Sequence, residues 1–145
     1  MAKTKSTHVY IDTSAFLAVL LGESESKKIL AALGKKKICT SSLLVIESER
    51  NLIRMVREKI IEEDLYFSAR EALETEIDKL IIKEFSLDLC MSSHFPTVKT
   101  PRSLDLAHLR TALWFKKQLE CNDFLTLDRH QAGCAMELGL KALIQ

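Results

Sequence analysis

The sequence contains little glycine and proline, and it has no excess of charge of either sign. Four glycines and two prolines in 145 residues exclude a collagen-like or loop-dominated chain, and a hydrophobic content of 47% excludes a disordered one. A formal net charge of +1 gives no overall field that would attract a polyanion. We therefore expect one folded, helix-rich domain over residues 1–145, with residues 1–7 flexible.

The cysteines and the apolar stretches exclude further classes. Cys39, Cys90, Cys121 and Cys134 form no C-x-x-C pair and have no histidine at zinc-ligand spacing, so we expect free thiols, as in a reducing compartment. The apolar stretch from Ala15 to Leu21 is far shorter than the roughly 20 residues that cross a bilayer. The sequence therefore predicts a cytoplasmic protein that is neither secreted nor membrane-spanning.

Strand-like and helix-like patterns alternate along the chain. We expect strands over 8–12, 38–40, 85–89, 124–127 and 142–144, and helices over 13–21, 24–33, 42–60, 65–82, 103–119 and 129–138. Thr13 or Ser14 is the expected cap of the first helix, and residues 92–101 form the longest expected loop. Interleaved strands and helices predict an α/β fold with a mostly parallel sheet covered on both faces. Functional groups in such folds lie outside the carboxyl ends of the strands.

Four carboxylates occupy the ends of predicted elements. Asp12 ends the strand VYID, Asp128 follows the strand FLTL, Glu47 lies near the start of a long helix, and Asp105 lies in the first turn of another. Taken singly, each aspartate has an alternative interpretation as a turn residue, a helix cap or a complement to the helix dipole. Glu47, taken singly, could be a solvated helix residue.

Taken together, the four acids predict a metal site. If the sheet brings them into one cleft, their mutual repulsion at short range reaches several kcal/mol, and a divalent cation would stabilise the cluster. Oxygen ligands without imidazole or thiolate favour Mg²⁺ or Mn²⁺, which serve metal-activated attack of water on a phosphodiester. We therefore expect a metal, and not a helix, to be the partner of Asp12.

The residues around the acids carry a resemblance to a known family. The segments YIDTSAFLAVL, TSSLLVIESERNLIR, RSLDLAHLRTAL and FLTLDRHQAGCAMELGL resemble, in this order, the four acidic motifs of the PIN-domain nucleases, and most closely those of the VapC toxins of prokaryotic toxin-antitoxin pairs. The resemblance covers nearly the full length, although residues 84–101 match no motif. It implies a PIN-like α/β/α sandwich with a central, mostly parallel sheet.

The resemblance also assigns roles to residues. It implies a Mg²⁺- or Mn²⁺-dependent endoribonuclease in which Asp12, Glu47, Asp105 and Asp128 are the catalytic and metal-binding residues. Ser14 and Thr126 would orient the carboxylates or waters, unless they only cap the chain locally. It further implies an RNA substrate, a homodimer and a cognate antitoxin, which we expect between the helices at 23–33 and 42–60.

Basic and aromatic residues near the acids allow two interpretations. Arg50 and Arg54 share a helix face with Glu47 and could contact RNA phosphates, or could pair with neighbouring glutamates. His108, one turn after Asp105, could form a hydrogen bond near the site, but it is expected mainly to pack between helices. Trp114 and Phe115 are expected in the core or in a subunit contact.

Two other functions remain open at the level of the sequence. One is a catalytically inert PIN-like module that binds RNA or protein. The other is an aspartate-dependent phosphohydrolase with Asp12 as nucleophile, but the second aspartate that this chemistry favours is replaced by Ser14. The phosphohydrolase also leaves Glu47 and Asp105 without a role.

Overall fold

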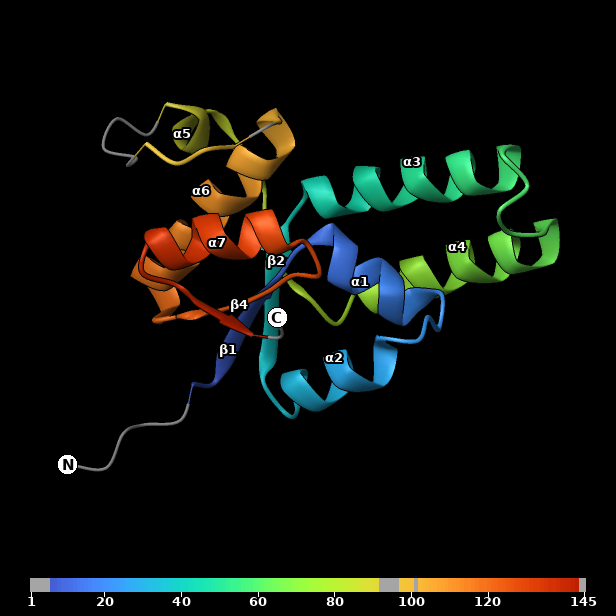
Figure 1. Cartoon of the computed structure of the whole chain (residues 1–145), viewed down its shortest axis with the longest axis horizontal. Helices are drawn as coiled ribbons and strands as arrows, with labels where there is room; N and C mark the ends of the chain where they lie inside the picture. Colours follow the sequence, from blue (N-terminus) through green and yellow to red (C-terminus); the bar gives the residue numbers. More distant parts are fainter. Residues whose placement is uncertain (1–5, 92–96, 101, 144–145) are drawn as a thin grey trace.

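A computed structural model describes residues 6–91, 97–100 and 102–143 of the chain. The elements follow the order strand, two helices, strand, two helices, strand, two helices, strand, helix, strand (Figure 1). Their bounds are β1 His8–Ile11, α1 Thr13–Leu20, α2 Ser26–Leu33, β2 Lys37–Ser41, α3 Leu43–Arg57, α4 Glu63–Ile77, β3 Ile81–Lys83, α5 Leu87–Cys90, α6 Ser103–Leu119, β4 Asp123–Leu125, α7 Arg129–Glu137 and β5 Lys141–Leu143.

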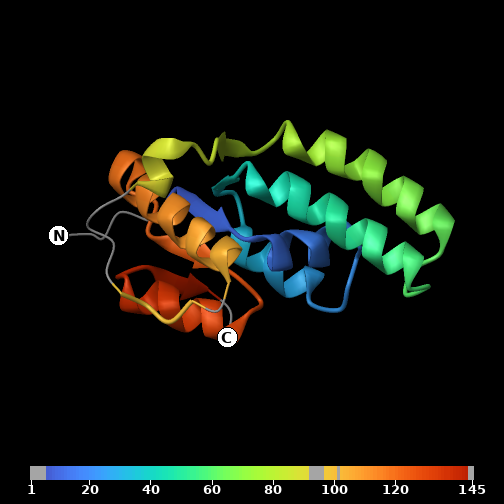
Figure 2. The same ribbon diagram turned by 90° about the horizontal axis from the view of Figure 1, so that it is seen from above.

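The strands form one five-stranded sheet in the order β3-β2-β1-β4-β5, and every pairing in it is parallel. Helices α1 to α4 lie on one side of the sheet, and α6 and α7 lie on the other (Figures 1 and 2). A parallel sheet requires such crossover helices because consecutive strands run in the same direction. The predicted α/β fold with a covered, parallel sheet is confirmed.

The central strand β1 divides the core into two clusters. Val9 and Ile11 point to the side of α1 and α2 and pack in a cluster with Phe16. Tyr10 points to the opposite side, where its ring stacks on Phe124 with a centroid distance of 5.3 Å and an interplanar angle of 12°. Side chains alternate across a strand, and each fully buried large apolar side chain contributes about 1.5–3 kcal/mol to stability. This core fixes β1 at the centre of the sheet.

The region after α4 differs from the sequence prediction. The helix predicted over 65–82 ends at Ile77, and the strand predicted over 85–89 is wrong: the strand is β3, Ile81–Lys83, and Leu87–Cys90 is the short helix α5. Ile81 and Ile82 pair with Cys39 and Thr40 of β2. The pairing with the sheet outweighs the helical spacing of these apolar residues, because β-branched side chains fit an edge strand well.

The predicted loop and the chain ends are described only in part. Of the loop at 92–101, the residues 92–96 and 101 lie outside the described residues, as do most of the segment 1–7 and Ile144 of the last predicted strand. The four cysteines are free thiols. In the described ranges, no helix combines the length and the apolar character needed to span a bilayer.

Helix α1 packs against both α2 and α3 and lies between them in both views (Figures 1 and 2). The helices expected to bound the antitoxin groove, at 23–33 and 42–60, therefore have α1 between them, and the place of the antitoxin stays a prediction. Phe16 and Ala18 of α1 are buried there, together with Ile29 of α2 and Leu44 of α3. Burial of this apolar surface is what holds α1 in the position of the predicted groove.

Candidate functional site

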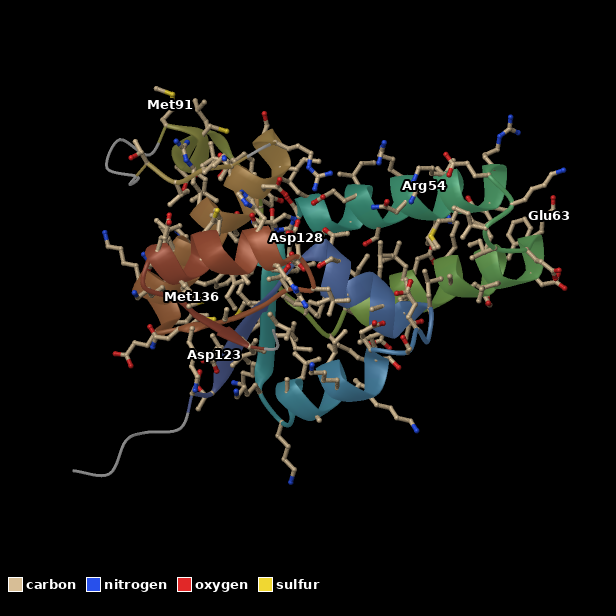
Figure 3. The ribbon with its side chains drawn as sticks, viewed as in Figure 1. Arg54, Glu63, Met91, Asp123, Asp128 and Met136 are labelled. Atoms are coloured by element: carbon tan, nitrogen blue, oxygen red, sulfur yellow. The ribbon has the colours of Figure 1, made fainter. Side chains whose placement is uncertain are left out.

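The carboxyl ends of β1 and β4 lie side by side, because these two strands are parallel neighbours in the sheet. The chain leaves these two ends toward opposite sides of the sheet. After β1 the chain enters α1 on one side of the sheet, and after β4 it enters α7 on the other side. Asp12 follows β1, and Asp128 lies three residues beyond the end of β4. Asp123, at the start of β4, lies at the far end of this strand from Asp128 (Figure 3). Such a switch point is the usual ligand-binding position of an open parallel sheet.

A cleft of about 620 Å³ opens at this switch point, and all four predicted acids line it: Asp12, Glu47, Asp105 and Asp128. We call it the acidic cleft. The acids come from the end of β1, from α3, from α6 and from the start of α7, so residues up to 116 positions apart in the chain (12 to 128) share one cavity. The prediction that the fold brings the four acids to one cleft is confirmed; their roles in binding and catalysis stay predictions.

Asp12 is the N-cap of α1. This corrects two expectations: that Thr13 or Ser14 caps the helix, and that Asp12 has a metal and not a helix as its partner. Its Oδ1 accepts hydrogen bonds from the backbone N–H of Ala15 (3.2 Å) and from Ser14 Oγ (2.7 Å). The cap is thus neither Thr13 nor Ser14, and a helix terminus is a partner of Asp12. Aspartate serves well here because its short side chain reaches the unpaired N–H groups of the first turn. Asp12 is 6% exposed, and burial raises its pKa, although hydrogen bonds from Thr126 and Ser14 oppose that effect.

Ser14 and Thr126 join the ends of β1 and β4 through the carboxylate of Asp12. Thr126 donates to Asp12 Oδ2, and Ser14, which donates to Oδ1, accepts the backbone N–H of Leu127 at 3.1 Å. The backbone N–H of Asp128 in turn donates to Thr126 Oγ1 at 3.0 Å. These contacts fix both carboxylate oxygens of Asp12, so the orienting role predicted for the two hydroxyls agrees with their geometry.

Glu47 is held by a buried histidine. His108 Nε2 lies 2.6 Å from Glu47 Oε1, and Thr13 Oγ1 donates to the same oxygen at 3.1 Å. On the other side of the ring, His108 Nδ1 lies 2.6 Å from the hydroxyl of Tyr10. His108 is 3% exposed, so it packs in the core as predicted. It also forms a hydrogen bond in the cleft, the alternative role that its position one turn after Asp105 had left open.

Asp105 and Asp128 are held by groups close to them in the chain. Arg102 Nε donates to Asp105 Oδ2 at 3.2 Å, and the hydrogen bond and charge of Asp105 raise the pKa of the guanidinium. Asp128 is the N-cap of α7, and its Oδ1 accepts the backbone N–H groups of His130 (2.9 Å) and Gln131 (3.2 Å). The alternative interpretation of Asp128 as a helix cap is therefore correct, and it coexists with the place of Asp128 in the acidic cleft.

Negative charge exceeds positive charge in the lining of the acidic cleft. Five carboxylates, the four predicted acids and Glu23, face three guanidinium groups, those of Arg50, Arg54 and Arg102. Arg54 pairs with Glu58 at 2.8 Å, as expected, whereas Arg50 forms no ion pair with any described residue. The expected neighbour Glu49 pairs instead with Arg70 of α4.

The donor set fits a divalent cation in chemical type. All predicted ligands are carboxylate oxygens, which Mg²⁺ and Mn²⁺ prefer. Gln131, 2% exposed, lies in the cleft wall and donates to the backbone oxygen of Asp105 at 2.9 Å, but its Oε1 is buried without a partner among the described residues. Buried acceptors are normally paired, so this oxygen is available to ligate a cation or to accept a hydrogen bond from a water bound to the cation. As the side chains stand, no three His, Cys, Asp or Glu residues of the described ranges converge on one ion position.

Several residues of the acidic cleft were not predicted from the sequence, and Thr13, Arg102 and Gln131 are among them. Thr13 follows Asp12 directly, Arg102 precedes Asp105 by three residues, and Gln131 follows Asp128 by three residues. The last two spacings place side chains near each other across one turn of helix. That signal could have identified Arg102 and Gln131, whereas the contact of Thr13 with Glu47 depends on the packing of α1 against α3.

Comparisons with known proteins agree with this fold. The family model described as the PIN domain matches residues 9–145. The structure of PAE2754 from Pyrobaculum aerophilum superposes with a TM-score of 0.51 at 14% identity, covering 94% of this chain and 92% of that one. A domain of a functionally unknown protein from Methanocaldococcus jannaschii superposes with a TM-score of 0.52 at 19% identity, covering 97% and 91%. The sequence matched none of the curated proteins with which it was compared.

Proposed function

We propose that this chain, which belongs to the PIN domain family, is a Mg²⁺- or Mn²⁺-dependent endoribonuclease that cleaves phosphodiester bonds in the acidic cleft. PIN domains are in general metal-dependent nucleases; the RNA substrate and the choice of cation are the proposal. One observation carries it: four carboxylates from four separate segments line a single cleft at the switch point of the sheet. Folding four acids into one cavity costs stability, which favours a functional reason for the cluster.

Asp12, Glu47, Asp105 and Asp128 would hold the cation. When bound, it would activate a water for attack and stabilise the charge that develops on the phosphate. Asp12 is already oriented by Ser14 and Thr126. Glu47 and Asp105 would have to turn toward the ion. Arg102, which pairs with the carboxylate of Asp105, has a side chain that is 70% exposed, so that ion pair contributes little and separates easily.

The arginines of the cleft would hold the RNA backbone. Arg50 forms no ion pair with a described residue, and Arg54 pairs with Glu58, whose side chain is 55% exposed. Guanidinium groups bind phosphate with paired hydrogen bonds. Both side chains line the acidic cleft, so phosphates next to the cleaved bond would lie within their reach.

The resemblance of the four motifs to VapC toxins supports a finer proposal, the toxin of a toxin-antitoxin pair with a cognate antitoxin as partner and a homodimer as its assembly. Since α1 fills the space between α2 and α3, we place the antitoxin over the acidic cleft itself. An antitoxin bound there should block cleavage, and its removal from the purified complex should restore it.

The test is incubation of the purified chain, freed of any co-purifying protein, with cellular RNA in Mg²⁺, in Mn²⁺ and in EDTA. Asp105→Asn is the test variant because its side chain is nearly isosteric and lies at the rim of the core. Asp78→Asn is the matched control, because Asp78 is an exposed carboxylate at the end of α4. We expect discrete cleavage that requires metal, persists in Asp78→Asn and falls at least 100-fold in Asp105→Asn.

Three results would overturn the proposal. Cleavage that is equal in wild type and Asp105→Asn would come from a contaminating nuclease. Cleavage absent from all lanes, with RNA still bound, would favour the inert binding module. An aspartate-dependent phosphohydrolase would instead release phosphate from a small phosphorylated substrate and leave the RNA intact.

A further inference from the structure

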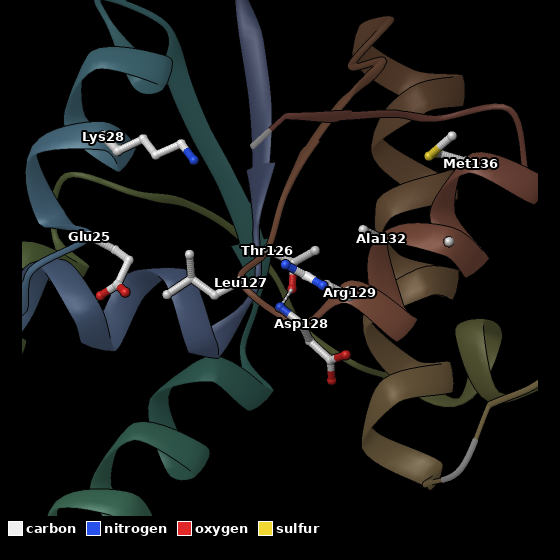
Figure 4. Close-up of a pocket in the computed structure, with 9 residues that line it drawn as sticks. Glu25, Lys28, Thr126, Leu127, Asp128, Arg129, Ala132 and Met136 are labelled. Atoms are coloured by element: carbon white, nitrogen blue, oxygen red, sulfur yellow. Dashed lines mark hydrogen bonds between the residues drawn. The ribbon is translucent and has the colours of Figure 1, made fainter. Parts of the chain in front are cut away.

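A second groove adjoins the acidic cleft at Asp128. It has a volume of about 560 Å³ and lies between α2 and α7, over the segment Thr126–Asp128 (Figure 4). Asp128 lines both cavities, so the α2/α7 groove continues from the place where cleavage is proposed. A strand of nucleic acid longer than one nucleotide must leave the acidic cleft somewhere, and this groove is one exit that the described residues provide.

Two cationic side chains flank the α2/α7 groove. Lys28 extends from α2 and Arg129 from the first turn of α7 (Figure 4), and neither forms an ion pair with a described residue. The carboxylate of Asp128 is held by the N–H groups of α7 and points away from Lys28. Glu25, the remaining acid, accepts a hydrogen bond from Ser24 at 2.9 Å. The two cations are thus available to an anionic ligand.

The floor of the α2/α7 groove is apolar and contains no aromatic side chain. It is formed by Leu127, Ala132 and Met136. Proteins that bind single strands through their bases usually stack them on aromatic rings, and such rings are missing from this lining. Contacts here would therefore be made to the phosphate backbone, which positions a strand without reading its sequence.

We infer that the α2/α7 groove holds the RNA strand on one side of the cleavage position, with Lys28 and Arg129 contacting backbone phosphates independently of base sequence. This inference rests on the proposed function and extends it from the cleaved bond to the path of the substrate. Arg50 and Arg54 line the acidic cleft and not this groove. The strand then has cationic side chains in both cavities.

The test compares RNA binding by Lys28→Ala/Arg129→Ala with that of wild type over a series of salt concentrations. The probes are two short labelled single strands, one of adenylates and one of uridylates, in EDTA to prevent cleavage. Lys27→Ala/Arg57→Ala is the matched control, since it removes the same charge from exposed positions outside both cavities. A steady-state assay in Mg²⁺ adds a second readout.

We expect the test variant to bind both RNAs at least tenfold more weakly at low salt, with the control close to wild type. A plot of the logarithm of its binding constant against the logarithm of the salt concentration should have a slope shallower by about 1.4. Each phosphate of a single strand that the protein no longer neutralises reduces this slope by roughly 0.7. In Mg²⁺ the KM should rise by a similar factor while kcat changes little, because Lys28 and Arg129 line the α2/α7 groove and not the acidic cleft.

Several outcomes would overturn the inference. If the test variant binds RNA with the affinity and the salt dependence of wild type, the inference fails, while the proposed nuclease activity still stands. A loss confined to one of the two RNAs would mean that the groove reads bases. Unchanged RNA binding with loss of a co-purifying protein would reassign the groove to a protein partner. If wild type neither binds nor cleaves RNA, the proposed function fails together with the inference.

Discussion

His108 donates a hydrogen bond from Nε2 to Oε1 of Glu47 across 2.6 Å, joining α6 to α3 at the floor of the acidic cleft. A neutral imidazole that donates from Nε2 accepts at Nδ1. In that form of the ring, the hydroxyl of Tyr10, 2.6 Å from Nδ1, donates to it and fixes its tautomer. Tyr10 is fully buried, so the orientation of Glu47 depends on a residue at the centre of the sheet.

This contact predicts that His108 positions a metal-binding carboxylate. His108→Leu should weaken Mn²⁺ binding about 10- to 100-fold, as the loss of a hydrogen bond to a ligand typically does. His108→Gln should retain most of the affinity, because its amide N–H can replace Nε2–H. The measurement is titration of the free protein with Mn²⁺, followed by electron paramagnetic resonance.

The control for this prediction is His8→Gln, at the start of β1 and outside the acidic cleft. A purely structural role for His108 would lower the melting temperature in both His108 variants and leave the Mn²⁺ affinity of the folded protein unchanged. That result would contradict the positioning role.

A divalent cation should stabilise the fold. A ligand that binds only the folded state at 100 times its Kd adds about 2.7 kcal/mol, which raises the melting temperature of a chain of this size by roughly 5–10 °C. We expect this shift in wild type on adding Mg²⁺ or Mn²⁺ after EDTA, measured by calorimetry. Glu47→Gln should reduce the shift, and an equal shift in that variant would place the ion elsewhere.

Asp12→Asn should change the pH dependence of stability in EDTA. Burial raises the pKa of Asp12 above its ordinary value of 3.8, so the folded protein retains this proton better than the unfolded chain. The stability contributed by the protonated group is complete below the unfolded pKa and is lost as pH rises through the folded pKa. Asparagine does not ionise and can still accept the N–H of Ala15. The melting temperature of the variant minus that of wild type should therefore increase with pH from about 4 upward, and a constant difference would contradict the prediction.

Ser48→Ala should stabilise the protein. Ser48 of α3 is fully buried, and its hydroxyl has no hydrogen-bond partner among the described residues. Removing an unpaired buried hydroxyl and replacing serine by alanine in a helix both favour folding, by about 1 kcal/mol together. Chemical denaturation measures the change. The control is Ser68→Ala, where the exposed hydroxyl donates to the backbone oxygen of Leu65; a loss of stability specific to Ser48→Ala would indicate a paired hydroxyl.

The sequence by itself determined the fold class and the place of the four acids. Alternating strands and helices leave a parallel sheet as the compact solution, and the carboxyl ends of parallel strands lie at one edge. Asp12 and Asp128 had to approach each other there, because β1 and β4 both end in that direction. These features depend on local patterns and on chain direction, which a sequence records.

Only the tertiary structure decided how those acids are held. Strand β3 displaced the end of a predicted helix because its pairing partner lies in β2. His108 turned out to connect Tyr10 with Glu47. Such contacts join residues as many as 98 positions apart, and no local spacing encodes them. They follow from the packing of α6 and α3 around β1, where burial forces each polar group to find a partner.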